Sequence, residues 1–211
     1  MNINYTKEKL IEFELEIADC FNNKMILAPI HLSDGNEESL IEIFKDVQED
    51  DWIFSTWRSH YHCLLKGVPE QELKEAILQG RSITLCFKEY NIFSSAIVGG
   101  NIPIAVGTAL DLKRKNSKQK VWCFVGDMGS NMGAFKEALK YSINHDLPII
   151  FVIENNGKSV CTDTYDCWGT DKFEYEQDEY NKVYTINKHL KYYKYNFLKW
   201  KHAGTNIRVQ F

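Results

Sequence analysis

The stretch that decides the fold reads VWCFVGD over residues 121–127, MGSNMG over residues 128–133 and PIIFVIENN over residues 148–156. The first and last pieces are apolar runs of strand length, and an amphipathic run over residues 134–146 separates them. The pattern predicts a strand, a glycine-rich turn, a helix and a second strand. Such a crossover places two parallel strands in one sheet, with both carboxyl ends at the same edge.

Two polar residues mark the ends of these strands, Asp127 after the first and Asn156 after the second. If the strands are neighbours, about 4.8 Å separates them, so both side chains meet in one crevice. A carboxylate and an amide oxygen are hard ligands of the kind that Mg²⁺ accepts. The helix expected to start near Asn131 points free N–H groups and its positive dipole end into the same crevice, which is typical of a diphosphate site. The alternative is an ordinary strand–helix–strand unit with polar strand ends.

The same stretch resembles the thiamine diphosphate signature, in which Gly-Asp-Gly is followed further along the chain by Asn-Asn. The fuller similarity is to the α subunit of the 2-oxoacid dehydrogenase E1 component, whose pattern is Gly-Asp-Gly-Ala-Ala-Asn-x-Gly-x-Phe-x-Glu-Ala/Ser. The residues in register are Gly126, Asp127, Asn131, Gly133, Phe135, Glu137 and Ala138. Met128 departs from the pattern, which has glycine there, and its side chain would crowd the backbone approach to the diphosphate.

Three upstream segments extend the resemblance over residues 28–160. Residues 31–37 are similar to the family's His-x-Ser-x-Gly-Gln-Glu. Residues 51–60 are similar to its Asp-x-x-Phe-x-x-Tyr-Arg-x-His, and residues 97–107 to its Ile-Val-Gly-x-x-x-Pro-x-Ala-x-Gly. The resemblance implies an α/β fold of the transketolase and E1 α type, with helices on both faces of a parallel sheet. It implies thiamine diphosphate and Mg²⁺ as cofactors.

The resemblance also implies roles for individual residues. Arg58 would contact the diphosphate beside the aromatic Trp57, and the backbone at Val98 would bond the aminopyrimidine. The full cofactor-binding set would be Trp57, Arg58, Val98, Gly126, Asp127, Met128, Gly129 and Asn156. The metal ligands would be Asp127, Asn156 and the carbonyl of Lys158. His60 is the candidate catalytic residue. The alternatives are that Arg58 is a surface charge and His60 an exposed helix residue.

The chain is expected to supply only part of an active site. In this family the carboxylate that acts on the pyrimidine belongs to a second domain, often a separate β chain, and no second apolar α/β pattern follows here. We therefore expect an α-type subunit in an α₂β₂ assembly with a β-type partner. When isolated, it should expose a large apolar face at Ile104–Leu112 and Tyr192–Trp200.

The reaction implied by the resemblance is decarboxylation of a 2-oxo acid. The fragment would pass to a lipoyl domain, an aldehyde or a sugar. One alternative is a transketolase-like subunit for carbon–carbon transfer. The other is a catalytically degenerate structural subunit, which is favoured by Met128 and by Thr84 at a position where the family often has histidine.

Composition narrows the class of protein. The 211 residues carry a net charge of −4, so the chain lacks the excess of positive charge that is typical of nucleic-acid-binding proteins. No apolar run approaches the roughly 20 residues that span a bilayer, and the first residues do not resemble a signal peptide. Six cysteines show no Cys-x-x-Cys spacing. We expect free thiols and a cytoplasmic location, although Cys161 and Cys167 could form a disulfide.

Periodicity predicts the remaining elements. A helix should follow Thr6, a good N-cap. Further helices are expected around Leu40–Val47, up to Leu65, over Glu70–Leu78 and over Ile104–Leu112. Residues 81–95 are expected to be irregular. We expect one domain over residues 1–165, followed by a C-terminal extension over residues 166–211.

Overall fold

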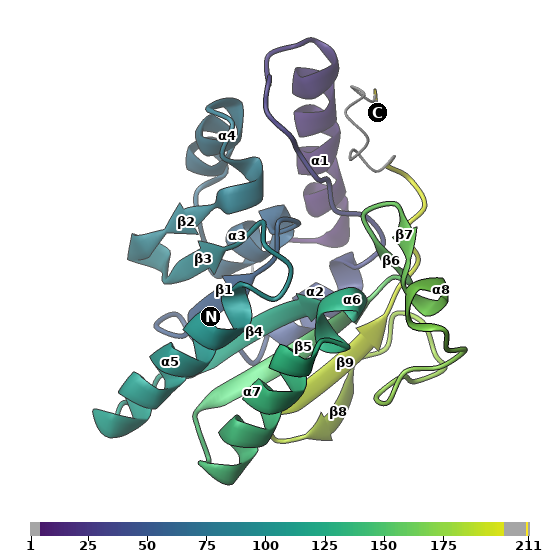
Figure 1. Cartoon of the computed structure of the whole chain (residues 1–211). Helices are drawn as coiled ribbons and strands as arrows, with labels where there is room; N and C mark the ends of the chain where they lie inside the picture. Colours follow the sequence, from purple (N-terminus) through teal and green to yellow (C-terminus); the bar gives the residue numbers. More distant parts are fainter. Residues whose placement is uncertain (1–4, 201–209, 211) are drawn as a thin grey trace.

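A central sheet runs through the part of the chain that the computed structural model describes, residues 5–200 and 210. Its seven strands lie in the order β2-β3-β1-β4-β5-β9-β8 (Figure 1). Its parallel strands are β3 (Ile92–Ser94), β1 (Trp52–Ser55), β4 (Val121–Gly126), β5 (Ile149–Asn155) and β9 (Leu190–Lys194). The edge strands β2 (Cys86–Phe87) and β8 (Tyr184–Asn187) are antiparallel to their neighbours. A separate small hairpin pairs β6 (Lys158–Ser159) with β7 (Thr162–Asp163).

The helices begin and end largely where local signals place them. The Thr6 hydroxyl accepts the N–H of Lys9 at 3.4 Å, and Gly67 ends α3 in the left-handed region with a φ of 99°. The α-helices are α1 (Lys7–Asn22), α2 (Glu37–Phe44), α3 (His60–Lys66), α4 (Glu70–Leu78), α5 (Asn101–Arg114), α6 (Asp127–Ser130), α7 (Gly133–Asn144) and α8 (Thr164–Trp168). Two 3₁₀ turns, η1 (Ser82–Thr84) and η2 (Lys88–Tyr90), complete the set.

The sheet separates two apolar cores, one on each face. Alternate residues of a strand point to opposite faces. Trp122 and Phe124 therefore pack with α1, α2, α3 and α4, while Val121, Cys123 and Val125 pack with α5 and α7. This arrangement confirms the predicted α/β class, with helices covering both faces of a mainly parallel sheet.

One prediction about organisation was wrong, because residues 81–95, expected to be irregular, contain β3, a strand of the central sheet. Within the predicted C-terminal extension, β9 continues the main sheet beside β5 from Phe151↔Leu190 to Asn155↔Lys194. Residues 201–209 and 211 of the predicted extension, like residues 1–4, lie outside the described residues.

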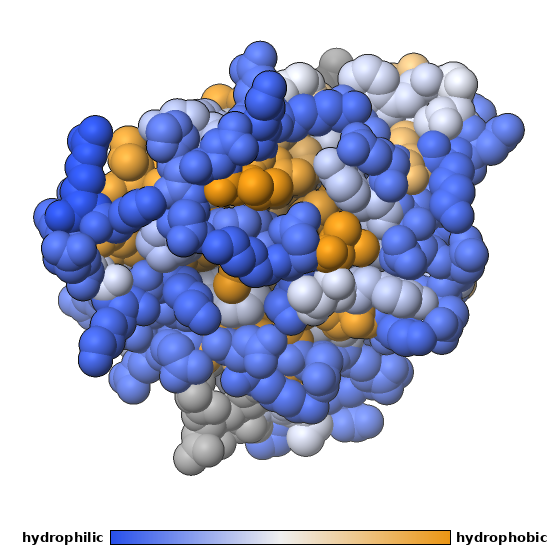
Figure 2. All heavy atoms as spheres, turned by 90° about the horizontal axis from the view of Figure 1, so that it is seen from below, coloured by the Kyte–Doolittle hydropathy of each residue, from blue (hydrophilic) through white to orange (hydrophobic). Residues whose placement is uncertain are grey.

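Part of the apolar face predicted to be exposed is buried. Most of the aromatic tail is buried in this chain's own core, including Tyr192, Tyr193, Tyr195 and Trp200. Figure 2 views the molecule from below, and from this side the apolar residues form patches separated by hydrophilic ones. Within residues 5–200, no helix has the length and apolar character needed to cross a bilayer. All six cysteines are free thiols, as predicted.

Two glycines test how closely the loop before α2 packs against the chain that follows β9. Gly35 has a φ of 80°, and a Cβ added there would lie 2.0 Å from the carbonyl oxygen of Asn196, whereas one at Gly107 would meet nothing within 4 Å. We predict that Gly35→Ala destabilises the fold by more than about 2 kcal/mol because of the clash and the strained φ. The matched control Gly107→Ala, at an exposed helix position, should stabilise it by roughly 0.5–1 kcal/mol. Urea unfolding measures both, and equal effects would contradict the described packing.

Candidate functional site

A cleft lies where the five parallel strands reach their carboxyl ends. Trp57 and Arg58 follow β1, Val98 follows β3 and Asp127 follows β4. Residues of the chain beyond β5 and β9 complete the lining. After β1 the chain passes to β3 on one side and later to β4 on the other, and ligands of open α/β sheets bind at such a switch point. We refer to this site as the strand-end cleft.

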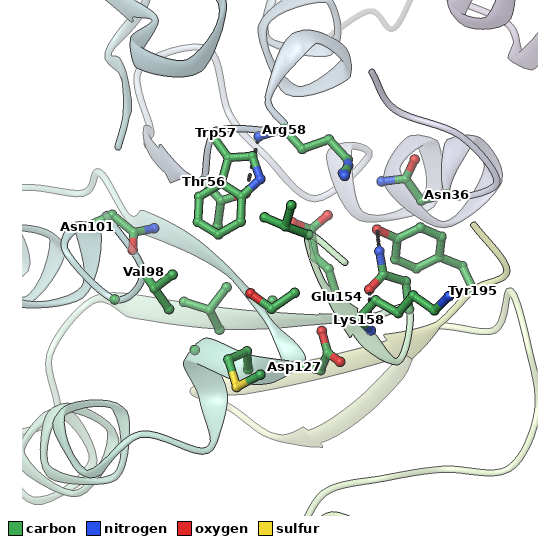
Figure 3. A pocket seen from close by; sticks show the side chains of 18 residues that line it. Asn36, Thr56, Trp57, Arg58, Val98, Asn101, Asp127, Glu154, Lys158 and Tyr195 are labelled. Carbon is green, nitrogen blue, oxygen red and sulfur yellow. Dashed lines mark hydrogen bonds between the residues drawn. The ribbon is translucent and has the colours of Figure 1, made fainter. Parts of the chain in front are cut away.

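Every cofactor and metal residue implied by the sequence lines the strand-end cleft, namely Trp57, Arg58, Val98, Gly126, Asp127, Met128, Gly129, Asn156 and Lys158. The sequence did not single out the other lining residues, which are Asn36, Thr56, Gly99, Asn101, Val125, Glu154, Ser159, Val160 and Tyr195. Figure 3 shows Asp127 on the lower side of the cleft and Arg58 with Asn36 on the opposite side. Segments more than a hundred residues apart in the chain therefore meet here.

The Asp127 carboxyl is buried and poorly solvated. Its side chain is 2% exposed, and within the described residues its Oδ2 accepts no hydrogen bond. Burial raises the pKa of Asp127 to about 6, although the nearby Thr164 hydroxyl and the backbone N–H groups of Asp127 and Met128 favour the charged form. The carboxylate is thus held where a cation would satisfy it.

The turn after β4 fixes the position of Asp127. Asp127 is the first residue of the short helix α6, and its backbone carbonyl accepts hydrogen bonds from the Ser130 hydroxyl at 2.9 Å and the Asn131 side-chain N–H at 2.8 Å. The motif residue Asn131 therefore closes the turn. The helix predicted to start near it is α7, which begins at Gly133 and does not line the cleft. The expectation that this helix points its N-terminus into the crevice was wrong, because α6 intervenes.

Asn156 is fixed by two hydrogen bonds. Its Oδ1 accepts the backbone N–H of Lys158 at 3.0 Å, and its Nδ2 donates to the Tyr195 hydroxyl at 3.2 Å. The strand pairing from Val121↔Ile149 to Gly126↔Glu154 confirms that β4 and β5 are parallel neighbours. Asp127 and Asn156 consequently lie at one edge of the sheet.

Arg58 is buried on the other side of the cleft. It is 9% exposed, and its guanidinium lies 4.3 Å from the ring centroid of Phe197. Burial lowers the pKa of Arg58, while the negative charges of Glu14 and Glu154 oppose that shift. The alternative that Arg58 is a surface charge is therefore wrong. A buried arginine that opens into a cleft suits recognition of an anion.

His60 lies outside the strand-end cleft. It is fully buried, its Nδ1 lies 2.9 Å from Glu14 Oε2, and its Nε2 lies 2.8 Å from Ser82 Oγ. The Glu14 carboxylate also accepts the backbone N–H of Ser33 at 2.7 Å. The geometry gives no support to a catalytic role, nor to the alternative of an exposed helix residue. His60 instead links α1, α3 and η1 beneath the segment that carries Arg58.

Glu154 is a further buried polar residue in the lining of the cleft. Glu154 lines the cleft, accepts the Tyr193 hydroxyl and lies 3.3 Å from His62 Nε2. Glu154 belongs to the quoted strand, so its position inside the motif was an available signal. Asn36, which lies 3.4 Å from the Tyr193 hydroxyl, belongs to a segment that the resemblance already covered. Tyr195 had no such signal, because only the pairing of β9 with β5 brings it to the cleft.

A family model described as the dehydrogenase E1 component matches residues 5–177. This match covers most of the chain, and the chain therefore belongs to the dehydrogenase E1 component family.

Three curated relatives agree with this assignment. The α subunit of acetoin:2,6-dichlorophenolindophenol oxidoreductase from Bacillus subtilis is 31% identical over 169 residues, covering 74% of this chain and 50% of that protein. The pyruvate dehydrogenase E1 component α subunit of Porphyra purpurea is 30% identical over 181 residues, covering 73% and 53%. The chloroplastic pyruvate dehydrogenase E1 component α-3 subunit of Arabidopsis thaliana is 32% identical over 160 residues, covering 68% of this chain and 37% of that protein. The chain spans about half the length, or less, of these relatives.

The raised pKa of Asp127 predicts a pH-dependent cost to the fold. Its ordinary value is 3.8 and its folded value is about 6, so its contribution to stability is present below pH 4 and is lost as pH rises through 6. We predict that Asp127→Asn stabilises the metal-free protein by roughly 3 kcal/mol at pH 8, with little gain near pH 4. Urea unfolding in EDTA at both pH values measures this. A gain that does not change with pH would contradict the assigned burial of the charge.

Proposed function

We propose that this chain binds thiamine diphosphate and Mg²⁺ in the strand-end cleft, as the α-type subunit of a two-chain enzyme. The enzyme decarboxylates a 2-oxo acid and transfers the acyl or aldehyde fragment to an acceptor. The observation that carries the proposal is the arrangement of charge in the cleft. Asp127 and Asn156 follow the adjacent strands β4 and β5 and both line the cleft. The guanidinium of Arg58 lies on the side opposite the buried Asp127 carboxylate (Figure 3).

The donor set suits Mg²⁺. An ionised carboxylate without a hydrogen bond on one buried oxygen is costly, and a hard cation would offset that cost. Asn156 can add its Oδ1, because an amide oxygen has a second lone pair beyond the one that accepts from Lys158. The Lys158 carbonyl is the third protein ligand in this proposal, and water and phosphate oxygens would complete the shell, as is usual for Mg²⁺.

The rest of the cleft suits a diphosphate. Arg58 supplies a charge-assisted donor on one side, and the side chain of Lys158 adds a second cation to the lining. A Cβ added at Gly126 would meet nothing within 4 Å, so the backbone there is open to close approach. Met128, the departure from the family pattern, also lines the cleft, and it narrows the space beside that approach.

Several residues of the cleft have proposed roles in binding and orienting the cofactor. Thiamine diphosphate, when bound, supplies the carbanion-stabilising ring that decarboxylation of a 2-oxo acid requires. Asp127, Asn156 and Arg58 would hold the diphosphate end, and Trp57 and Val98 would face the rest of the cofactor. The carboxylate that acts on the pyrimidine would come from the β-type partner, because Glu154 is already engaged with Tyr193 and His62.

The pyruvate dehydrogenase relatives favour action on a 2-oxo acid over transketolase-like carbon–carbon transfer. The relatives are described as α subunits of pyruvate dehydrogenase and of an acetoin oxidoreductase. Their designation as α subunits implies a second kind of subunit, which supports a β-type partner for this chain, and we propose an α₂β₂ assembly.

Calorimetric titration of the full chain with thiamine diphosphate tests the proposal directly. We expect binding with Mg²⁺, much weaker binding in EDTA, and loss of the Mg²⁺ dependence in Asp127→Ala, because the loss removes the ionised ligand. Circular dichroism verifies that the variant is folded. Metal-independent binding by the wild type, or unchanged affinity in folded Asp127→Ala, would contradict the metal assignment.

Arg58→Ala separates diphosphate recognition from structural effects. A charge-assisted hydrogen bond contributes about 1.5–3 kcal/mol, so we predict a loss of about 10- to 100-fold in affinity for thiamine diphosphate. Affinity for thiamine, which has no phosphate, should barely change. Arg114→Ala on the exposed end of α5 is the control and should alter neither. Equal losses for both ligands in Arg58→Ala would mean that Arg58 acts through the fold.

The partner is tested by turnover. We predict that the purified chain does not decarboxylate 2-oxo acids, and that activity appears when a β-type chain is added. The physical reason is that the cleft provides a diphosphate and metal site but no uncommitted carboxylate for the pyrimidine. Light scattering and a decarboxylation assay, with and without the partner, measure this. Turnover by a monomer of this chain would overturn it.

A further inference from the structure

Three tyrosine hydroxyls accept from the adjacent asparagines at the end of β5, and two of them, those of Tyr192 and Tyr195, come from β9 and the residue after it. Asn155 Nδ2 donates to the Tyr192 hydroxyl at 2.9 Å, and Asn156 Nδ2 donates to the Tyr195 hydroxyl at 3.2 Å. Both tyrosines are buried, at 1% and 5% exposure. Asn156 and Tyr195 line the strand-end cleft, whereas Asn155 and Tyr192 line a neighbouring cavity that Asp127 also borders.

These tyrosines come from a part of the chain that the family model does not match. The match ends at residue 177, while Tyr192 lies in β9 and Tyr195 follows it. The parallel pairing of β5 with β9, which ends at Asn155↔Lys194, brings Tyr195 beside Asn156. The backbone N–H of Tyr195 also donates to the Asn155 carbonyl at 2.9 Å, so its position is fixed by the sheet.

The segment that follows Tyr195 is anchored to the loop before α2. Asp34 Oδ2 accepts the backbone N–H groups of Leu198 at 3.1 Å and Lys199 at 2.8 Å. Trp200 Nε1 donates to the Ser33 carbonyl at 2.9 Å. Tyr195 is therefore held at both ends, by the sheet on one side and by this anchored segment on the other.

We propose that Tyr195 is a positioning residue for the cation site, acting through the Asn156 carboxamide. This inference rests on the proposed function, because it assigns Asn156 as a metal ligand. The terminal torsion of an asparagine is broad, so a carboxamide held at one point can rotate. Tyr195 at the Nδ2 end and the Lys158 N–H at the Oδ1 end hold it at two points. This arrangement keeps the amide oxygen, and not the nitrogen, available to the cation beside Asp127.

The reverse orientation is disfavoured on chemical grounds. Rotating the carboxamide would set its NH₂ group against the Lys158 N–H, which places two donors together and leaves neither satisfied. Loss of the Tyr195 hydroxyl would leave Nδ2 without its buried acceptor, and the carboxamide would then be free to turn towards water in the cleft. Residues that orient a metal ligand typically contribute 10- to 100-fold to metal affinity.

The test compares Tyr195→Phe with the matched control Tyr192→Phe. Each variant removes one buried hydroxyl that accepts from one asparagine of the pair, and in Tyr192→Phe the Asn155 Nδ2 keeps its second acceptor, the Tyr165 hydroxyl at 3.2 Å. The measurements on the full chain are Mn²⁺ binding by electron paramagnetic resonance in saturating thiamine diphosphate, and the melting temperature in EDTA. We expect Tyr195→Phe to weaken Mn²⁺ binding by about 10-fold or more, and Tyr192→Phe by less than about 2-fold, with similar melting temperatures.

The same tyrosine change in an Asn156→Asp variant tests whether Tyr195 acts through the Asn156 carboxamide. In Asn156→Asp, a carboxylate presents an oxygen whichever way it turns, so adding Tyr195→Phe should cost far less Mn²⁺ affinity than it does in the wild type. Equal losses in the two backgrounds, equal losses in the two tyrosine variants, or wild-type affinity in Tyr195→Phe would each overturn the inference. If the wild type binds no Mn²⁺ with thiamine diphosphate, the proposed function fails and the inference fails with it. If the wild type binds and Tyr195→Phe binds equally well, only the role of Tyr195 is lost.

Discussion

Backbone hydrogen bonds hold β4 and β5 in parallel from Val121↔Ile149 to Gly126↔Glu154, and the site depends on that register. Because side chains alternate along a strand, a slip of one residue would move the side chains of each apolar core to the opposite face, into the other core. The two cores on opposite faces of the sheet therefore lock the register. Once it is fixed, the residues after β4 and β5 must emerge together, so Asp127 and Asn156 become neighbours without any direct bond between them.

The cleft concentrates polar groups that the fold alone would not favour. Asp127 is buried with one carboxylate oxygen that has no hydrogen bond, and the buried Arg58 guanidinium stacks over the Phe197 ring. Glu154 accepts a hydrogen bond from the Tyr193 hydroxyl. Buried charges are costly unless they are paired, so such a concentration is typical of a site prepared for a ligand. A cation would satisfy the unpartnered Asp127 oxygen, and an anion could face the Arg58 guanidinium, so the proposed metal diphosphate would suit both sides of the cleft.

The accuracy of the sequence predictions followed the range of the interactions involved. Asp127 and Asn156 were predictable because each directly follows a strong apolar run, and the topology of a crossover does the rest. Tyr195 was not, because β8 and β9 are short and polar-rich and join the sheet only through pairing with a distant strand. The burial of His60 was not predictable for a related reason. Its partners Glu14 and Ser82 lie on separate elements, and nothing local distinguishes a buried polar network from a surface helix.

The most direct test of the central claim is a crystal structure of the full chain with thiamine diphosphate and Mn²⁺, using anomalous scattering to locate the metal. The account predicts one strong anomalous peak between the Asp127 carboxylate and Asn156 Oδ1, with the diphosphate extending from it towards Arg58. A peak elsewhere, or thiamine diphosphate bound away from the strand-end cleft, would contradict the account.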